Sequence, residues 1–343
     1  MTTDHDRACY AGLDVSMEET HLCVIDGGGA ILVEGKVAST PDAIARALAA
    51  VPGLARAVFE TGRMAPMLFH GLRGRGVPAV CIESRQAHHT LKAIKANKSD
   101  RNDARGLAQL ARTGFFKPTH VKSLSAHAVR ALLAARKKLV GQRVTLENQI
   151  RGLAVVFGAR LPRSLTPAFK TQALAMAQGV PSLATAMRGL LDARDAVLAA
   201  VAAIDRDVRA MARASEACRL LTTVPGVGPI TALAFAAAID DPARFRRSRE
   251  VGAYLGLTPR RYQSGETDYN GSITKQGDTR LRTLLYEAAS VLLTRTKADF
   301  ALKDWARGVA MRSSSRKARV ALARRLAVIM HAMLRDRTPF QAA

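Results

Sequence analysis

The chain has 343 residues and a formal net charge of +24, and 48% of its residues are hydrophobic while only 5% are aromatic. This length allows about two or three domains, and a composition rich in alanine, leucine and valine favours helices over a β-sandwich. A positive excess of this size indicates a polyanionic partner. Nucleic acid fits better than a membrane, because we find no apolar run of about 18 residues, no signal peptide and no lipidation motif. We therefore expect a cytoplasmic protein.

The first part of the chain reads as α/β. Short β-rich runs and helical patterns alternate, and the expected elements are strands at 8–16, 19–26 and 30–39, a helix at 40–51, a strand at 55–61, a helix at 64–76, a strand at 77–84, and a long helical stretch from about 85, broken near 96–98. The first three strands are expected to be consecutive and antiparallel. Three strands, helix, strand, helix, strand and helix is the order of the ribonuclease-H-like fold.

The middle of the chain has a different character. Residues 125–157 and 181–218 show sustained apolar spacing at i, i+3, i+4 and i+7, and a less regular piece with Pro162, Pro167 and Pro181 separates them. Two long amphipathic helices need partners, so we expect a helical hairpin or an intermolecular coiled coil. This region is interpreted as a spacer and dimerisation element of a homodimer or homotetramer.

The last part is expected to be mainly α-helical, which gives predicted domains at 1–122, 123–218 and 219–343. Residues 220–239 read as a short helix, a PGVG turn and a second helix, a pattern like the helix-hairpin-helix. There Gly226 and Gly228 would let backbone amides at a helix start face a DNA phosphate. The alternative is a tight turn between helices with no ligand.

Four acids need an explanation because they stand in a strongly basic protein. Asp14 lies late in the first predicted strand, Glu60 ends the fourth, and Asp100 and Asp103 are spaced to share one helix face. In a ribonuclease-H-like sheet the first and fourth strands are neighbours, and a following helix would bring the other two acids across them. Crowded carboxylates repel unless cations neutralise them, and their hard oxygens suit Mg²⁺ or Mn²⁺. Two such ions can clamp a scissile phosphate.

Each acid also has an ordinary structural interpretation. Asp14 would be a turn former at a strand end, and Glu60 a surface acid before a loop. Asp100 would be a helix N-cap, with Asp103 a first-turn charge on the helix dipole. The metal site is the better interpretation only when all four acids and the strand order are taken together. The four cysteines, in contrast, show no metal-ligand spacing and are expected to be core residues in a reducing compartment: Cys9, Cys23, Cys81 and Cys218.

Five segments in this order resemble a known family: YAGLDVS, VFETG, KSDRNDARGLA, VPGVGPITA, and GLTPRRYQSG followed by ITKQGDTRLR. They are similar to the DEDD-type transposases of insertion sequences, the IS one-ten group of bridge-RNA-guided recombinases. The resemblance spans most of the chain. It implies a RuvC-like domain in which Asp14, Glu60, Asp100 and Asp103 are the DEDD acids and hold Mg²⁺ or Mn²⁺.

The resemblance also implies a nucleophile outside the acidic part. Ser264 in TPRRYQSG would attack a DNA phosphodiester and form a phosphoserine link, with the acids and their metal completing the site across protomers. Ser272 is the competing hydroxyl. Arg260 and Arg261 would stabilise charge on the phosphoryl oxygens. An element-encoded guide RNA would select donor and target DNA by base pairing.

Three more cations, Lys275, Arg280 and Arg282, stand at a predicted helix start and are candidates for contacts to backbone phosphates, although they are equally at home as solvated charges. Two other classes of function stay open. A junction-resolvase-like metal nuclease would use water and need the acids but not Ser264. A non-catalytic nucleic-acid-binding protein would bind without cutting.

Overall fold

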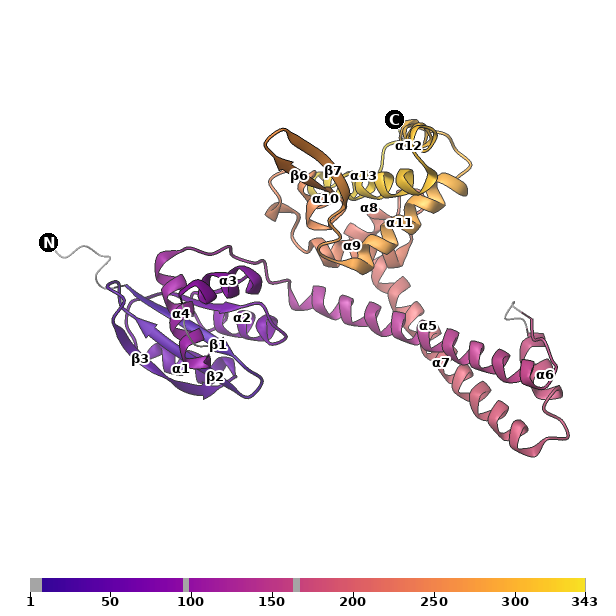
Figure 1. Cartoon of the computed structure of the whole chain (residues 1–343), viewed down its shortest axis with the longest axis horizontal. Coiled ribbons are helices and arrows are strands. Elements are labelled where there is room, and N and C mark those ends of the chain that lie inside the picture. Colours follow the sequence, from indigo (N-terminus) through magenta and orange to yellow (C-terminus); the bar gives the residue numbers. More distant parts are fainter. Residues whose placement is uncertain (1–7, 95–98, 163–166, 343) are drawn as a thin grey trace. The chain divides into compact units, whose positions relative to one another are not determined.

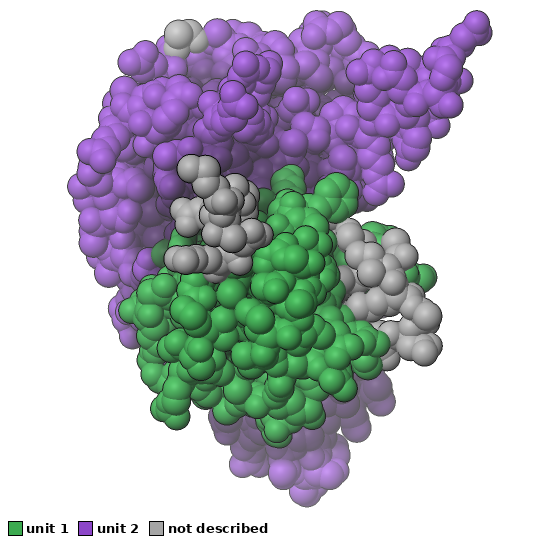
Figure 2. Space-filling model, turned by 90° about the vertical axis from the view of Figure 1, so that its left-hand side faces the viewer, with its two compact units in different colours: residues 1–124 green, residues 125–343 purple. Residues whose placement is uncertain are grey.

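The computed structural model describes residues 8–94, 99–162 and 167–342. It forms two compact units, residues 1–124 and residues 125–343 (Figure 1; Figure 2). Within the described residues, no helix is both long and apolar enough to cross a bilayer. The predicted break near residues 96–98 lies outside the described ranges.

The first unit is built on a five-stranded mixed sheet. Its strands are β1 Cys9–Val15, β2 Glu19–Ile25, β3 Ile31–Ala38, β4 Leu54–Glu60 and β5 Ala79–Ile82, in the order β3-β2-β1-β4-β5 (Figure 1). The pairs β1–β2 and β2–β3 are antiparallel, whereas β1–β4 and β4–β5 are parallel. The α/β prediction is confirmed for this unit, and the sheet is consistent with a RuvC-like domain.

Helices cover both faces of this sheet: α1 Pro41–Ala49, α2 Ala65–Arg73, α3 Ser84–Ile94 and α4 Asp100–Thr113. Because side chains alternate along a strand, each strand supplies two cores. Leu13 and Phe59 pack with Leu68 of α2, while Val58, the neighbour of Phe59, packs with Leu107 of α4. The strand residues that share a face with Val58 therefore face α4.

Helix α4 approaches β1 very closely. A Cβ atom added at Gly12 would lie 2.1 Å from the carbonyl oxygen of Ala104 and 2.2 Å from the backbone nitrogen of Ala108, so only glycine fits there. The helix is also fixed to the edge strand β3, because Arg101 and Arg105 both donate hydrogen bonds to Glu34. These bonds hold the pKa of Glu34 at about 2.

The second unit starts with a pair of long helices, α5 Leu124–Val156 and α7 Pro181–Ala214, with α6 Pro167–Ala175 between them. The predicted long helices are present. Arg136 of α5 donates to Asp205 of α7 at 2.5 and 3.1 Å, and Glu147 of α5 accepts from Arg194 of α7 at 3.2 Å. The residue numbers rise along one helix as they fall along the other, so the two helices pair antiparallel within one chain. This is the helical hairpin, one of the two predicted arrangements.

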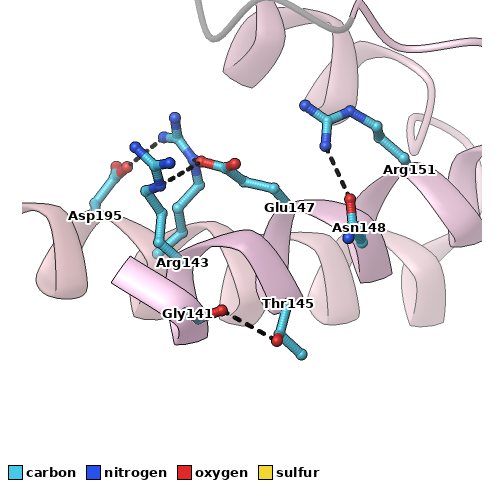
Figure 3. A network of polar contacts seen from close by, with 8 residues as sticks. Gly141, Arg143, Thr145, Glu147, Asn148, Arg151 and Asp195 are labelled. Atoms are coloured by element: carbon cyan, nitrogen blue, oxygen red, sulfur yellow. Dashed lines mark hydrogen bonds and ion pairs between the residues drawn. The ribbon is translucent and has the colours of Figure 1, made fainter. Parts of the chain in front are cut away.

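A charged network lies inside this hairpin. Glu147 and Arg194 are only 3% and 8% exposed, and Arg194 also donates to Asp195. Arg143 lies 3.7 Å from Glu147 on the same helix, and Figure 3 shows Arg143 between the carboxylates of Glu147 and Asp195. Phe169 of α6 packs beneath the Arg194 guanidinium, 5.4 Å from its ring centroid. The network joins all three helices.

The rest of the second unit is mainly helical, as predicted: α8 Glu216–Leu221, α9 Pro229–Ile239, a 3₁₀ turn Pro242–Arg244, α10 Glu250–Tyr254, α11 Thr279–Thr294, α12 Ala301–Arg312 and α13 Ser315–Asp336. Helix α9 is buried on almost every side and lies among α7, α8 and α11. A two-stranded hairpin, β6 Pro259–Ser264 and β7 Thr267–Ile273, projects from this helical body (Figure 1).

Candidate active site

Asp14 and Glu60 lie side by side at the carboxyl ends of two neighbouring parallel strands. Leu13 of β1 pairs with Phe59 of β4, so the next residue of each strand is the acid. By strand alternation both acids lie on the α4 face, as do Gly12 and Val58. Both line a hollow of about 220 Å³ with the loop after β4. The register thus places two carboxylates together, as the sequence predicts.

The first turn of α4 brings the other two acids toward the same face. Ser99 caps the helix, because its Oγ accepts a hydrogen bond from the backbone of Asn102 at 3.3 Å. Asp100 is the first helical residue, so its interpretation as the N-cap is wrong. Asp103 comes directly before Ala104 in α4. The carbonyl of Ala104 lies over Gly12 of β1, and Gly12 is two residues before Asp14. Asp103 is half-buried and Asp100 is exposed.

His21 is a neighbour of these acids that the sequence did not point to. It pairs directly with Asp14 across the antiparallel β1–β2 ladder. Its Nε2 atom lies 3.8 Å from the Asp100 carboxylate. A histidine on the second strand, in register with the acid on the first, is the signal that would have identified it.

The donor set fits a hard divalent cation, because carboxylate oxygens are the ligands that Mg²⁺ and Mn²⁺ prefer. In the part of the chain that the structure describes, however, no three His, Cys, Asp or Glu side chains are arranged to hold a metal ion. Asp14 and Glu60 would supply two ligands from the sheet. The remaining acids come from the start of α4, which is fastened to the sheet by Gly12 and Glu34.

Ser264 is placed at the end of an exposed β-hairpin. It is the last residue of β6 and pairs with Thr267 across a two-residue turn, in which Gly265 has a φ of +56°. Such a left-handed conformation suits glycine. Tyr262 and Tyr269 form the next pair on the same face, with ring centroids 4.9 Å apart and stacked. The serine hydroxyl is therefore presented on an open, aromatic face.

The two arginines of this hairpin differ in their contacts. Arg261 lies on the opposite face from Ser264 and donates two hydrogen bonds to Asp268, at 2.9 and 2.6 Å. Both partners are exposed, and the pair bridges the two strands. Arg260 alternates onto the Ser264 face and reaches the carbonyl of Thr274 at 3.4 Å. Of the two, Arg260 is the one on the side of the nucleophile.

The cations after the hairpin also divide by their contacts. Arg282 donates to the carbonyls of Leu255 and Gln276 at 3.1 and 2.5 Å, so it ties the loop before α11 to the end of α10. Arg280 is half-buried, and burial lowers its pKa. Lys275 is exposed and has a φ of +57°. Lys275 is the member of this set best placed to reach a ligand.

The two glycines of the PGVG turn have different surroundings. Gly226 has a φ of +87°, and a Cβ there would lie 2.5 Å from the carbonyl of Ala288 in α11. Its lack of a side chain thus lets the turn pack on α11. Gly228 is the N-cap of α9 and has open space around it. The four cysteines are all buried, as expected of core residues.

Glu34 is a second residue that sequence reasoning missed. Its partner Arg105 is 71 residues away in the chain, and a glutamate in the run ILVEG carries no local sign of that contact. The register of β3 against β2 and the docking of α4 decide the pairing together. No pattern within either segment predicts it.

Comparisons with known proteins place this geometry in a family. Residues 11–156 match the DEDD model of IS110-type transposases, and residues 218–303 match a model described as the transposase IS116/IS110/IS902 family. The first match contains most of β1 and all of β4 and α4, with the four acids. The second contains the PGVG turn and the β6–β7 hairpin.

Whole-chain relatives agree with these models. The transposase for insertion sequence element IS1111A of Coxiella burnetii is 31% identical over 330 residues, which cover 94% of this chain and 88% of that protein. A "Probable family 20 transposase" of Pseudomonas aeruginosa is 32% identical over 275 residues, covering 76% and 81%. The transposase for IS1328 of Yersinia enterocolitica is 28% identical over 249 residues, covering 72% and 75%. The chain therefore belongs to the IS110-type family of DEDD transposases, enzymes of DNA transposition.

Proposed function

We propose that this transposase cuts and rejoins DNA strands with Ser264 as the nucleophile, assisted by an acid site formed by Asp14, Glu60, Asp100 and Asp103. The observation that carries the proposal is the register of β1 and β4, which sets Asp14 beside Glu60 beneath the first turn of α4. The exposure of Ser264 on a projecting hairpin supports its part, since a DNA backbone can reach it without rearrangement of a core.

The proposed reaction exchanges one phosphoester for another. The Ser264 Oγ–H bond breaks as Oγ bonds to phosphorus, and one phosphorus–oxygen bond to deoxyribose breaks, so that the released hydroxyl gains the proton. Attack of a hydroxyl from another strand on the phosphoserine reverses these steps and regenerates the serine. The number of phosphoester bonds is unchanged, so the exchange needs no external energy source.

The chain's own groups have separate tasks. Arg260, on the Ser264 face of the hairpin, supplies positive charge to the phosphoryl oxygens. The four acids would hold Mg²⁺ or Mn²⁺, and such a cation, when bound, would supply Lewis-acid stabilisation of charge on the phosphate. Arg261 acts indirectly, because its side chain is paired with Asp268 on the neighbouring strand.

An element-encoded guide RNA is proposed to select donor and target DNA by base pairing, in a homodimer or homotetramer. The net charge of +24 supports binding of more than one nucleic-acid strand, because each phosphate contact needs a cation. The α5–α7 hairpin supports assembly, because Val155, Val156 and Phe157 at the end of α5 are each at least half exposed. Large apolar side chains in consecutive exposed positions are typical of contact surfaces.

The test of the nucleophile is a trapped protein–DNA adduct. Purified protein is incubated with Mg²⁺, guide RNA and labelled donor DNA, then separated on a denaturing gel. Ser264→Ala is expected to abolish the covalent adduct while DNA binding stays intact, because the substitution removes one exposed oxygen. Ser272→Ala, on the neighbouring strand, is the matched control and keeps the adduct.

Other results would assign the chemistry differently. An adduct that persists in Ser264→Ala and disappears in Ser272→Ala would move the nucleophile to β7. Strand cleavage without any adduct in the wild-type protein would indicate a nuclease that uses water. Binding without cleavage in either Mg²⁺ or Mn²⁺ would indicate a non-catalytic nucleic-acid-binding protein.

A further inference from the structure

A groove of about 700 Å³ lies between the base of the β6–β7 hairpin and helix α13, away from Ser264 at the hairpin's other end. One wall is formed by Pro259 and residues 271–273 of the hairpin. The floor is apolar and comes mainly from α13, through Val320, Ala321 and Val328. Every residue involved belongs to the second unit.

The charged residues that line this groove all have one sign. They are Arg316, Lys317, Arg324 and Arg325, and none of the described residues lining it is acidic. All four are exposed. Four cations around an apolar floor complement a ligand that is anionic along one edge and apolar along the other.

The groove also contains Trp305, the only tryptophan of the chain. The Arg325 guanidinium lies 4.4 Å from its ring centroid. Indole rings and guanidinium groups are the two kinds of surface on which unpaired nucleobases stack. A double helix keeps its bases inside and would leave the apolar floor in contact with water.

We infer that this groove seats a single-stranded segment of DNA, namely the flank of the strand that Ser264 attacks. The choice of DNA rests on continuity, because the groove wall and the Ser264 strand are parts of one hairpin. From Pro259 to Ser264 is about 17 Å at the rise of a β-strand. That distance is short enough for one continuous strand to contact both the groove and Ser264. The inference rests on the proposed role of Ser264.

The single tryptophan gives a direct measurement. The full-length protein is titrated with short oligothymidylate, with oligouridylate of equal length, and with a DNA duplex of that length, while Trp305 fluorescence is followed. Single-stranded DNA is expected to quench the fluorescence saturably, and to bind about tenfold more tightly than the other two probes. Stronger quenching by oligouridylate would overturn the inference in favour of an RNA occupant.

A pair of charge variants tests the groove itself. Arg316→Gln with Lys317→Gln removes two of its cations, and the slope of log K against log salt for oligothymidylate is expected to fall by about 1.4, since single strands lose about 0.7 per phosphate contact. The matched control is Lys297→Gln with Arg312→Gln, which removes the same charge from exposed residues outside the groove. An equal fall in both pairs would overturn the inference.

Two further outcomes separate this inference from the proposed function. If the wild-type protein forms the adduct but the groove pair binds and cuts equally well, the groove inference fails and the serine mechanism stands. If no adduct forms while oligothymidylate still quenches Trp305, the serine mechanism fails, and the groove keeps its preference for single-stranded DNA without a link to Ser264. Fluorescence that changes with protein concentration alone would indicate a second copy of the chain as the occupant and would overturn the inference.

Discussion

At the scale of single residues, the position of the acids depends on residues outside the acid set. The lack of a side chain at Gly12 lets the backbone of α4 pack directly on the sheet. Glu34 accepts hydrogen bonds from two arginines of that helix. Both fix the turn that carries Asp100 and Asp103. Residues of this kind set how far two carboxylates on a helix lie from two on a sheet, and that distance decides whether the four share one ligand.

The Glu34 contact has a predictable dependence on pH. Hydrogen bonds from Arg105 and Arg101 lower the pKa of Glu34 from 4.5 to about 2, so the folded state favours the ionised form. The resulting stabilisation is fully present above the unfolded pKa and is lost as the pH falls from 4.5 toward about 2. Urea unfolding of the wild type and of Glu34→Gln should therefore show a difference in the free energy of unfolding that shrinks across this window. A difference that stays constant down to pH 2 would contradict the assignment.

At the scale of elements, the strands and the long helices follow from simple periodicity. The short buried runs of β1 and β4 and the apolar spacing along α5 and α7 are readable from sequence, because each element's own residues produce the pattern. The partner of α5 could not be predicted from the sequence, since an apolar stripe packs equally well within a chain or between chains. The ion pairs of Arg136 with Asp205 and of Glu147 with Arg194 identify the partner as α7 of the same chain.

The candidate site was predictable to a similar extent. The adjacency of Asp14 and Glu60 follows from strand order, which the alternation of strands and helices indicates. The cap at Ser99 and the contact between His21 and Asp100 depend on where α4 begins after a change of direction, and no periodic pattern fixes that point. The exposure of the β6–β7 hairpin likewise depends on how the helices of the second unit pack, and this cannot be predicted from the hairpin's own residues.

The Glu147–Arg194 pair gives a prediction for the helical hairpin. Glu147→Leu alone leaves the buried Arg194 short of a partner and should lower the free energy of unfolding of the hairpin by about 3 kcal/mol. Combining it with Arg194→Met should recover most of that loss, because a well-packed apolar pair replaces the ion pair. The measurement is the urea dependence of proteolysis in α5 and α7.

A control for this experiment lies close by. Lys170→Met breaks the ion pair of Lys170 with Asp195, whose members are both substantially exposed, and should change stability little. If the double variant were no more stable than Glu147→Leu, the two side chains would act independently, and the network would not be the reason for their burial.

At the scale of the whole molecule, the proposed chemistry is divided between two units. The four acids belong to residues 1–124 and Ser264 to residues 125–343. The family resemblance implies that the acids of one protomer and the serine of another form each site. A symmetric dimer would then contain two composite sites, each with the acids of one chain and the serine of the other.

This division predicts complementation between inactive variants. Asp14→Asn and Ser264→Ala each abolish adduct formation alone, the first by removing a carboxylate and the second by removing the nucleophile. When the two are mixed and allowed to exchange subunits, about a quarter of the composite sites become intact, because half of the dimers are mixed and each holds one complete site. The adduct should reappear in the mixture on a denaturing gel. Its continued absence after proven exchange would place both parts of the site in one chain.

The burial of the thiols has a practical consequence. All four cysteines lie in cores, where desolvation raises the pKa of Cys23 and of Cys81 to about 11, so these sulfurs stay protonated and shielded near neutral pH. Ser264→Cys would then carry the one readily alkylated thiol of the protein. A maleimide dye would label the hairpin tip without removal of any native cysteine, and its shielding by added DNA would map when a strand arrives there.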